Sequence, residues 1–134
     1  MIKADVYIDK YRWLVHCYFA VDCYYTDEIV SRLRDMGCGI RYAEKAYDNM
    51  ALCSLDSGLC YSDTGKNESV MVTSIASSPA QFLNSFVHEI AHLADHISMR
   101  YGIKPGGEEY CALCGDISEI MFPQLVAGIM ETGL

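Results

Sequence analysis

Alternating apolar and polar positions open the chain and predict a β-hairpin. In residues 4–8, Val6 and Ile8 fall on the same face, and a period of two is typical of a strand with one buried side. Residues 13–20 are rich in β-branched and aromatic side chains, which are enriched in strands. We therefore expect these two segments to pair as neighbouring strands.

A helical period follows the hairpin. Thr26 is expected to cap a helix that Gly37 ends, with Ile29, Val30, Leu33 and Met36 on its apolar side. Residues 41–50 predict a second short helix, which turns Ala43, Ala46, Tyr47 and Met50 inward.

Short apolar segments then predict further strands. Residues 52–55 and 59–61 flank the turn sequence Asp56-Ser57-Gly58, and residues 63–67 form a second turn before the apolar segment 69–75. Together with the hairpin, these segments predict a small and mostly antiparallel sheet.

The segment from residue 78 onward predicts a long helix. Ser78, Pro79 and Gln81 have the spacing of a helix start with a capping box. Gly102 is suited to the end, so the helix is expected over residues 79–101. Its apolar positions keep a helical period: Phe82, Phe86, Ile90, Leu93 and Ile97.

Another helix is expected to begin near Gly107 and to end before Pro123, with a short apolar tail at residues 125–130. Gly106 and Gly107 allow the chain to turn back after Pro105, so this helix is expected to lie antiparallel to the long one. The sequence thus predicts a single α+β domain over residues 1–134.

The composition of the chain indicates which partners and which cell compartment to expect. The chain has 134 residues and a net charge of -8, and an acidic surface repels phosphate, so nucleic acid is not an expected partner. No run of about 20 apolar residues predicts a membrane span, and residues 1–10 lack the pattern of a secretion signal. The seven cysteines are then expected to be reduced thiols of a cytoplasmic protein.

One segment of the chain matches the HExxH zinc motif, namely His88-Glu89-Ile90-Ala91-His92. On a helix, positions i and i+4 lie about 6 Å apart on one face, so the two imidazoles can bind a single zinc ion. Glu89 lies beside this face and can take a proton from a water that the zinc activates. The alternative is that both histidines are ordinary helix residues.

A third ligand is required, and Glu108 and Glu109 are the candidates at the start of the following helix. Glu108 shares a helix face with small residues that permit close packing, namely Cys111, Ala112 and Gly115. Glu109 shares a face with Leu113 and Asp116. We therefore expect Glu108 to be the ligand, with Glu109 as the alternative.

Residues one turn beyond His92 are expected to support the site without binding the metal. A straight helix rises about 6 Å between His92 and His96, so one zinc ion does not easily reach both. Asp95 is placed to accept a hydrogen bond from an imidazole and orient it, with an ordinary surface carboxylate as the alternative. Tyr101, Tyr110 and His96 are candidates for stabilising an oxyanion, while Cys111 and Cys114 are interpreted as packed neighbours on a helix.

These residues resemble those of the gluzincins, metallopeptidases with HExxH on one helix and a zinc-binding glutamate on the next. The match covers His88, Glu89, His92 and either Glu108 or Glu109. Over about residues 69–122 the order of motifs also looks like that of small HExxH proteins of gut bacteria and their phages. The resemblance implies a zincin-like core, a zinc cofactor and hydrolysis of a peptide or protein substrate.

Two functions follow as hypotheses. The first is a zinc metallopeptidase, in which Glu89 acts as the general base. The second is a non-catalytic metal-binding protein with a structural or interaction role, of phage origin. An open coordination position favours the first hypothesis, and a fourth protein ligand favours the second.

Overall fold

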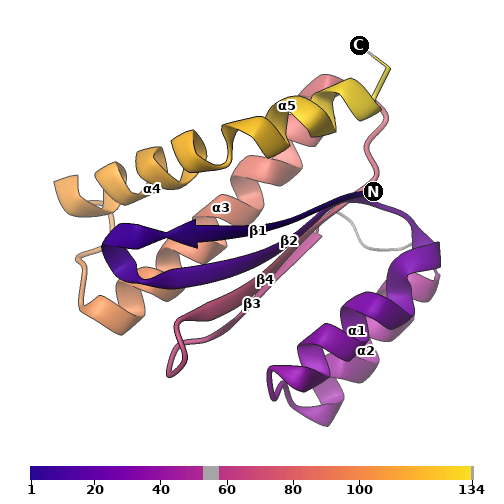
Figure 1. Ribbon diagram of the computed structural model, residues 1–134, viewed down its shortest axis with the longest axis horizontal. Coiled ribbons are helices and arrows are strands. Elements are labelled where there is room, and N and C mark those ends of the chain that lie inside the picture. The colour runs from indigo at the N-terminus through magenta and orange to yellow at the C-terminus, as the bar shows by residue number, and fades with distance from the viewer. Residues whose placement is uncertain (53–57, 134) are drawn as a thin grey trace.

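The computed structural model describes residues 1–52 and 58–133 and shows one sheet between two layers of helices (Figure 1). The strands are β1 (Ile2–Ile8), β2 (Trp13–Val21), β3 (Gly58–Asp63) and β4 (Glu68–Ser74). The α-helices are α1 (Thr26–Asp35), α2 (Ile40–Ala51), α3 (Pro79–Tyr101), α4 (Glu108–Ile120) and α5 (Phe122–Glu131). The predicted α+β class is confirmed. Of the predicted segment 52–55, all but Leu52 lies outside the described residues, as does the turn pair Asp56-Ser57.

The sheet has the strand order β1-β2-β4-β3 among the described residues. β1 and β2 pair antiparallel, with Val6 opposite Val15, and this confirms the predicted hairpin. β3 and β4 also pair antiparallel, whereas β2 and β4 pair parallel. Two of these three pairings are antiparallel, so the sheet is mostly antiparallel, as predicted.

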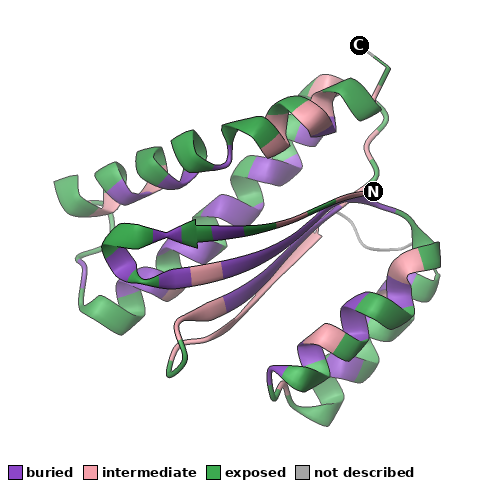
Figure 2. Cartoon of the chain, viewed as in Figure 1, coloured by how far each residue is buried: buried purple, intermediate pink, exposed green. Residues whose placement is uncertain are grey.

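Each face of the sheet carries its own core, because successive strand residues point to opposite sides. One face packs against α1 and α2 through Tyr18, Val70 and Val72. The other face packs against α3, α4 and α5, and its largest fully buried side chains include Trp13 and Phe19. Figure 2 shows the buried residues of both helical layers turned toward the sheet.

His16 joins three strands from within the sheet. It is 4% exposed, and its Nδ1 and Nε2 atoms lie 2.9 Å and 2.7 Å from carboxylate oxygens of Asp5 on β1 and Glu68 on β4. Because a carboxylate oxygen accepts hydrogen bonds, this arrangement satisfies the polar ring inside the fold. His16 therefore has the structural role expected for a histidine within a strand.

The N-terminus of α3 is capped by Ser78, whose hydroxyl accepts from the backbone amide of Gln81 at 3.1 Å. The expected capping box differs in one partner, because the Gln81 side chain accepts from the amide of Ser77 and not from that of Ser78. Gly102 ends the helix in the left-handed conformation, with φ of 66°, which glycine adopts without a steric penalty. Thr26 also departs from expectation: it is the first residue of α1, and its hydroxyl donates to the carbonyl of Cys23.

The C-terminal part of the chain is helical where the sequence predicted an apolar tail. The helical path breaks at Met121, and Pro123 falls in the first turn of α5, where its missing N–H costs no helical bond. Among the described residues no single helix is long and apolar enough to span a membrane. α4 and α5 reach that length and composition together, with a bend of 58° between them.

Gly128 allows α5 to pack closely on α3. A Cβ atom at this position would lie 2.0 Å from Cζ of Phe82, which is fully buried. Since buried rings have little room to shift in a close-packed interior, we expect Gly128→Ala to lower the free energy of unfolding by about 1–3 kcal/mol. Urea denaturation measures this difference.

Gly115→Ala is the matched control, because Gly115 is also helical and its Cβ would meet nothing within 4 Å. Alanine favours a helix over glycine, so this variant should be as stable as the natural protein or up to about 1 kcal/mol more stable. Equal stability changes in both variants would show that the α3–α5 contact is not tightly packed.

Candidate metal centre

His88 and His92 lie one turn apart on α3 and point to a common position. Their Nε2 atoms are 3.3 Å apart, and their ring planes meet at 67°. Two zinc–nitrogen bonds of usual length at a tetrahedral angle place the nitrogens about 3.3 Å apart, so the pair fits one zinc ion. The same distance permits an N–H···N hydrogen bond in the metal-free protein. Both rings are exposed, which leaves the position between them open to a substrate.

Glu89 contributes a buried carboxylate to the same site. The residue is 2% exposed, and its Oε2 atom has no hydrogen-bond partner. Its Oε1 atom lies 3.9 Å from Nε2 of His88. Burial raises the pKa of Glu89 to about 7, because a carboxylate charge is disfavoured away from water. An orphaned buried oxygen beside two imidazoles is an arrangement that a cation or a bound water would satisfy.

These three residues form a group that can hold a metal ion. One ligand atom from each of His88, Glu89 and His92 lies within 4.8 Å of the others, and it is the one such group of the described residues. The motif predicted from the sequence is thus assembled as expected.

Glu108 and Glu109 lie outside this group. The hydroxyl of Tyr110, in the first turn of α4, donates to Oδ1 of Asp95 at 2.9 Å. α4 therefore begins beside a part of α3 that is already about 4–5 Å beyond His92 along the helix axis. The role of Glu108, or of Glu109, as the third ligand stays a prediction. Asp95 accepts from Tyr110 in this structure, and its predicted role in orienting an imidazole also stays open.

A chain of hydrogen bonds connects His96 to the core. The Nε1 atom of Trp13 donates to the hydroxyl of Ser69 at 2.7 Å, and Ser69 lies 2.6 Å from the hydroxyl of Ser62. Ser62 in turn lies 2.6 Å from Nδ1 of His96. Burial lowers the pKa of His96, and the nearby His92 lowers it further. His96 is therefore held against β3, and the expectation that it does not bind the same metal stays a prediction.

No protein-family model matches the chain, and no match was found among curated proteins or among solved structures.

Two of the residues considered for stabilising an oxyanion have other partners. The hydroxyl of Tyr101 donates to the carbonyl of Tyr11 at 2.6 Å and accepts from the side-chain amide of Asn67. The hydroxyl of Tyr110 donates to Asp95. Both donors are engaged within the fold, so neither is directed at the histidine pair.

Tyr42 is a residue beside β3 that the sequence did not reveal. It lies on α2, on the other side of the sheet, and its ring contacts that of Tyr61 on β3 at 5.1 Å. Burial, together with the charge of Glu89, raises the pKa of Tyr42 to about 12. The phenol is therefore a proton donor at neutral pH. Nothing in the spacing of Tyr42 from Tyr61 could have indicated this contact.

Cysteines near the site are thiols. Burial raises the pKa of Cys60, and the charge of Glu89 raises it further, so Cys60 is an unreactive neutral group beside the metal centre. Its Sγ atom lies 4.0 Å from Nδ1 of His96. Five cysteines of the described residues are free thiols: Cys17, Cys38, Cys60, Cys111 and Cys114. Cys53 lies outside the described residues.

Proposed function

We propose that the protein is a zinc-dependent metallopeptidase in which His88 and His92 hold the metal. The observation that carries this proposal is the pair of Nε2 atoms 3.3 Å apart next to the buried, unpaired carboxylate of Glu89. Zinc suits two imidazole nitrogens, and when bound it supplies Lewis acidity that polarises a carbonyl and makes water more acidic. The pair is exposed, as an open catalytic site requires and a closed structural site does not.

Glu89 acts as the general base in this proposal. Its carboxylate takes a proton from the attacking water, whose oxygen bonds to the carbonyl carbon of the substrate. The carbon–nitrogen bond then breaks, and Glu89 delivers the proton to the leaving amine. A pKa near 7 suits both steps, because the group can accept and release a proton at neutral pH.

β3 is the strand on which the substrate is proposed to lie. β4, the strand that precedes α3 in sequence, lies between β2 and β3 with both of its edges paired, so it has no free edge for a peptide. β3 is the outer strand and contacts α3 through Ser62 and His96. An outer strand offers backbone groups that can pair with an extended peptide. We place this activity in the cytoplasm, where thiols such as those of the described cysteines stay reduced.

Metal binding is tested first, with protein stripped of metal and titrated with zinc by calorimetry. We expect one zinc ion per chain and a loss of affinity of roughly 100-fold or more in His92→Ala, because a ligand is removed. His96→Gln is the matched control and should keep its affinity, since His96 is held by Ser62. Equal binding by the natural protein and His92→Ala would overturn the metal site.

Glu108→Gln and Glu109→Gln, measured in the same titration, identify the third ligand. The variant that loses affinity marks the ligand, and full affinity in both would exclude the two residues. Hydrolysis of peptides by the zinc-loaded protein that a chelator stops would support the enzyme. Zinc binding without hydrolysis would instead support a non-catalytic metal-binding protein.

A further inference from the structure

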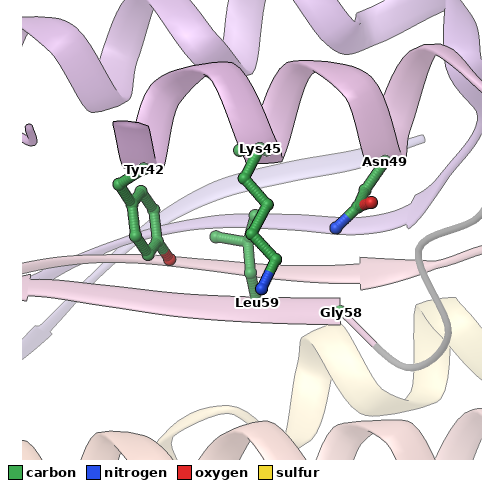
Figure 3. Close-up of a pocket in the computed structure, with 6 residues that line it drawn as sticks. Tyr42, Lys45, Asn49, Gly58 and Leu59 are labelled. Atoms are coloured by element: carbon green, nitrogen blue, oxygen red, sulfur yellow. The ribbon is translucent and has the colours of Figure 1, made fainter. Parts of the chain in front are cut away.

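β3 presents its side chains alternately to the two faces of the sheet. Leu59 lines a pocket of about 210 Å³ together with residues of α2, as Figure 3 shows. Cys60 and Ser62 point to the opposite face, where Sγ of Cys60 lies 4.0 Å and Oγ of Ser62 lies 2.6 Å from Nδ1 of His96. This second face of β3 is therefore the one that meets α3, and His96 is a point of contact between the two elements.

The hydrogen bonds behind His96 have a defined direction. The indole of Trp13 can only donate, so the hydroxyl of Ser69 accepts from it at 2.7 Å. Ser69 is fully buried, and the oxygen of Ser62 is the acceptor left for its hydroxyl hydrogen among the described residues. Ser62 then has its own hydrogen to donate to Nδ1 of His96. A neutral imidazole that accepts at Nδ1 carries its proton on Nε2.

His96 is neutral in this position, and its Nε2 atom is open to solvent. Burial lowers the pKa of the ring. The thiol of Cys60 beside Nδ1 stays protonated, because burial raises its pKa. A hydroxyl and a thiol, which both hold a hydrogen, therefore face Nδ1. Nε2 has no hydrogen-bond partner among the described residues and is not one of their buried unpaired atoms, so it is free to donate to a ligand.

His96 lies one helical turn beyond His92, on the side of α3 that meets β3. Four residues of a helix span about 6 Å, and one residue of an extended peptide spans about 3.4 Å. In Figure 1, α3 and β3 run in the same direction. A peptide that lies along β3 with its scissile bond at the metal therefore passes His96 about two residues away from that bond. Every residue of such a peptide carries a main-chain carbonyl oxygen that accepts hydrogen bonds.

We propose that His96 binds a main-chain carbonyl oxygen of the substrate through its Nε2–H group, in the tautomer that Ser62 and Ser69 set. This inference rests on the proposed function, because it adds a substrate-binding residue to the same site. The other tautomer would present a bare Nε2 nitrogen, which is a metal-ligating atom. The two serines therefore keep the third histidine of the series 88, 92 and 96 a donor to the peptide and not a ligand of the metal.

The tautomer is tested directly by long-range ¹H–¹⁵N NMR of the zinc-loaded protein labelled with ¹⁵N-histidine. We expect His96 to show a protonated Nε2 and an unprotonated Nδ1, with its signals assigned by their loss in His96→Gln. Ser62→Ala should lower the share of this tautomer, because it removes the donor to Nδ1. Ser118→Ala is the matched control and should leave the signals of His96 unchanged, since the Ser118 hydroxyl donates to a carbonyl of its own helix. A proton on Nδ1 in the natural protein would overturn the inference.

The contact with the substrate is tested with a peptide that the protein cleaves, extended by two residues on either side of the scissile bond. One of the two extensions should raise kcat/KM of the natural protein by about two- to tenfold, as one net hydrogen bond allows. The same extension should have no effect in His96→Leu. His96→Gln should keep part of the gain, because a glutamine amide also donates. Both variants should bind zinc as the natural protein does.

No gain from either extension, or equal gains in the natural protein and His96→Leu, would overturn the role of His96 and leave the hydrolase intact. A loss of zinc affinity in His96→Leu would also overturn it, because His96 would then be a metal ligand. Cleavage of no peptide at all would overturn the proposed function, and the role of His96 with it.

Discussion

Glu89→Gln is expected to lower kcat for peptide hydrolysis by about 10²- to 10⁴-fold, the usual contribution of a general acid–base group. Glutamine keeps the size and the burial of the side chain but cannot accept a proton from water. The two imidazole nitrogens are untouched, so zinc affinity should remain within about threefold of the natural value. Steady-state kinetics and zinc calorimetry on the same preparation measure the two quantities.

The control for this substitution is Glu119→Gln, which removes an exposed carboxylate from α4. Its turnover should be that of the natural protein. A Glu89→Gln variant with full turnover would contradict the general base. A variant that loses zinc and turnover together would show that Glu89 is a metal ligand. Glu89 could bind the metal, because one of its carboxylate oxygens lies within 4.8 Å of the imidazole nitrogens.

Local sequence signals predicted the elements of the fold well. Ser78 and Gly102 define the two ends of α3, because a side-chain cap and a left-handed glycine each act within a few residues. The alternation of Val6 and Ile8 likewise placed a strand with one buried face. Such signals depend on neighbours in sequence, so they can be recognised without knowledge of the rest of the fold.

These local signals could not predict which strands pair with one another in the sheet. The apolar segment that forms β4 was correctly identified as a strand, but its position between β2 and β3 was not. Parallel pairing of β2 with β4 requires a crossover, and here α1, α2 and β3 lie between the two strands in sequence. A central strand, which is paired at both edges, and an outer strand have similar apolar patterns, so the pattern does not distinguish them.

In the candidate site, too, the residues of one helix could be predicted from the sequence, and their contacts with other elements could not. His88, Glu89 and His92 are neighbours on one helix, so their convergence follows from helical geometry. Ser62 contacts His96 from β3, and no spacing in the sequence connects these two residues. The partner of Asp95 was missed for the same reason, because Tyr110 belongs to the next helix.

The buried carboxylate of Glu89 should also make stability depend on pH in the metal-free protein. Its pKa is about 7 in the folded chain against an ordinary value of 4.5, and burial is the cause. The folded state therefore binds more protons than the unfolded state between these two values, and the contribution of Glu89 to stability falls as the pH rises through this interval. A shift of this size corresponds to about 3 kcal/mol once the group is fully ionised.

Glu89→Gln removes this charge at every pH, so we expect the metal-free variant to be more stable than the natural protein by about 3 kcal/mol at pH 8 and by less than about 1 kcal/mol at pH 5. Urea denaturation of both proteins in the presence of a chelator measures the difference. Glu119→Gln should show no comparable change with pH, since Glu119 is exposed. A gain of equal size at pH 5 and pH 8 would mean that packing, and not ionisation, separates the two side chains. A gain confined to high pH would show that the fold accepts a destabilised carboxylate at the position where the proposed chemistry needs a base.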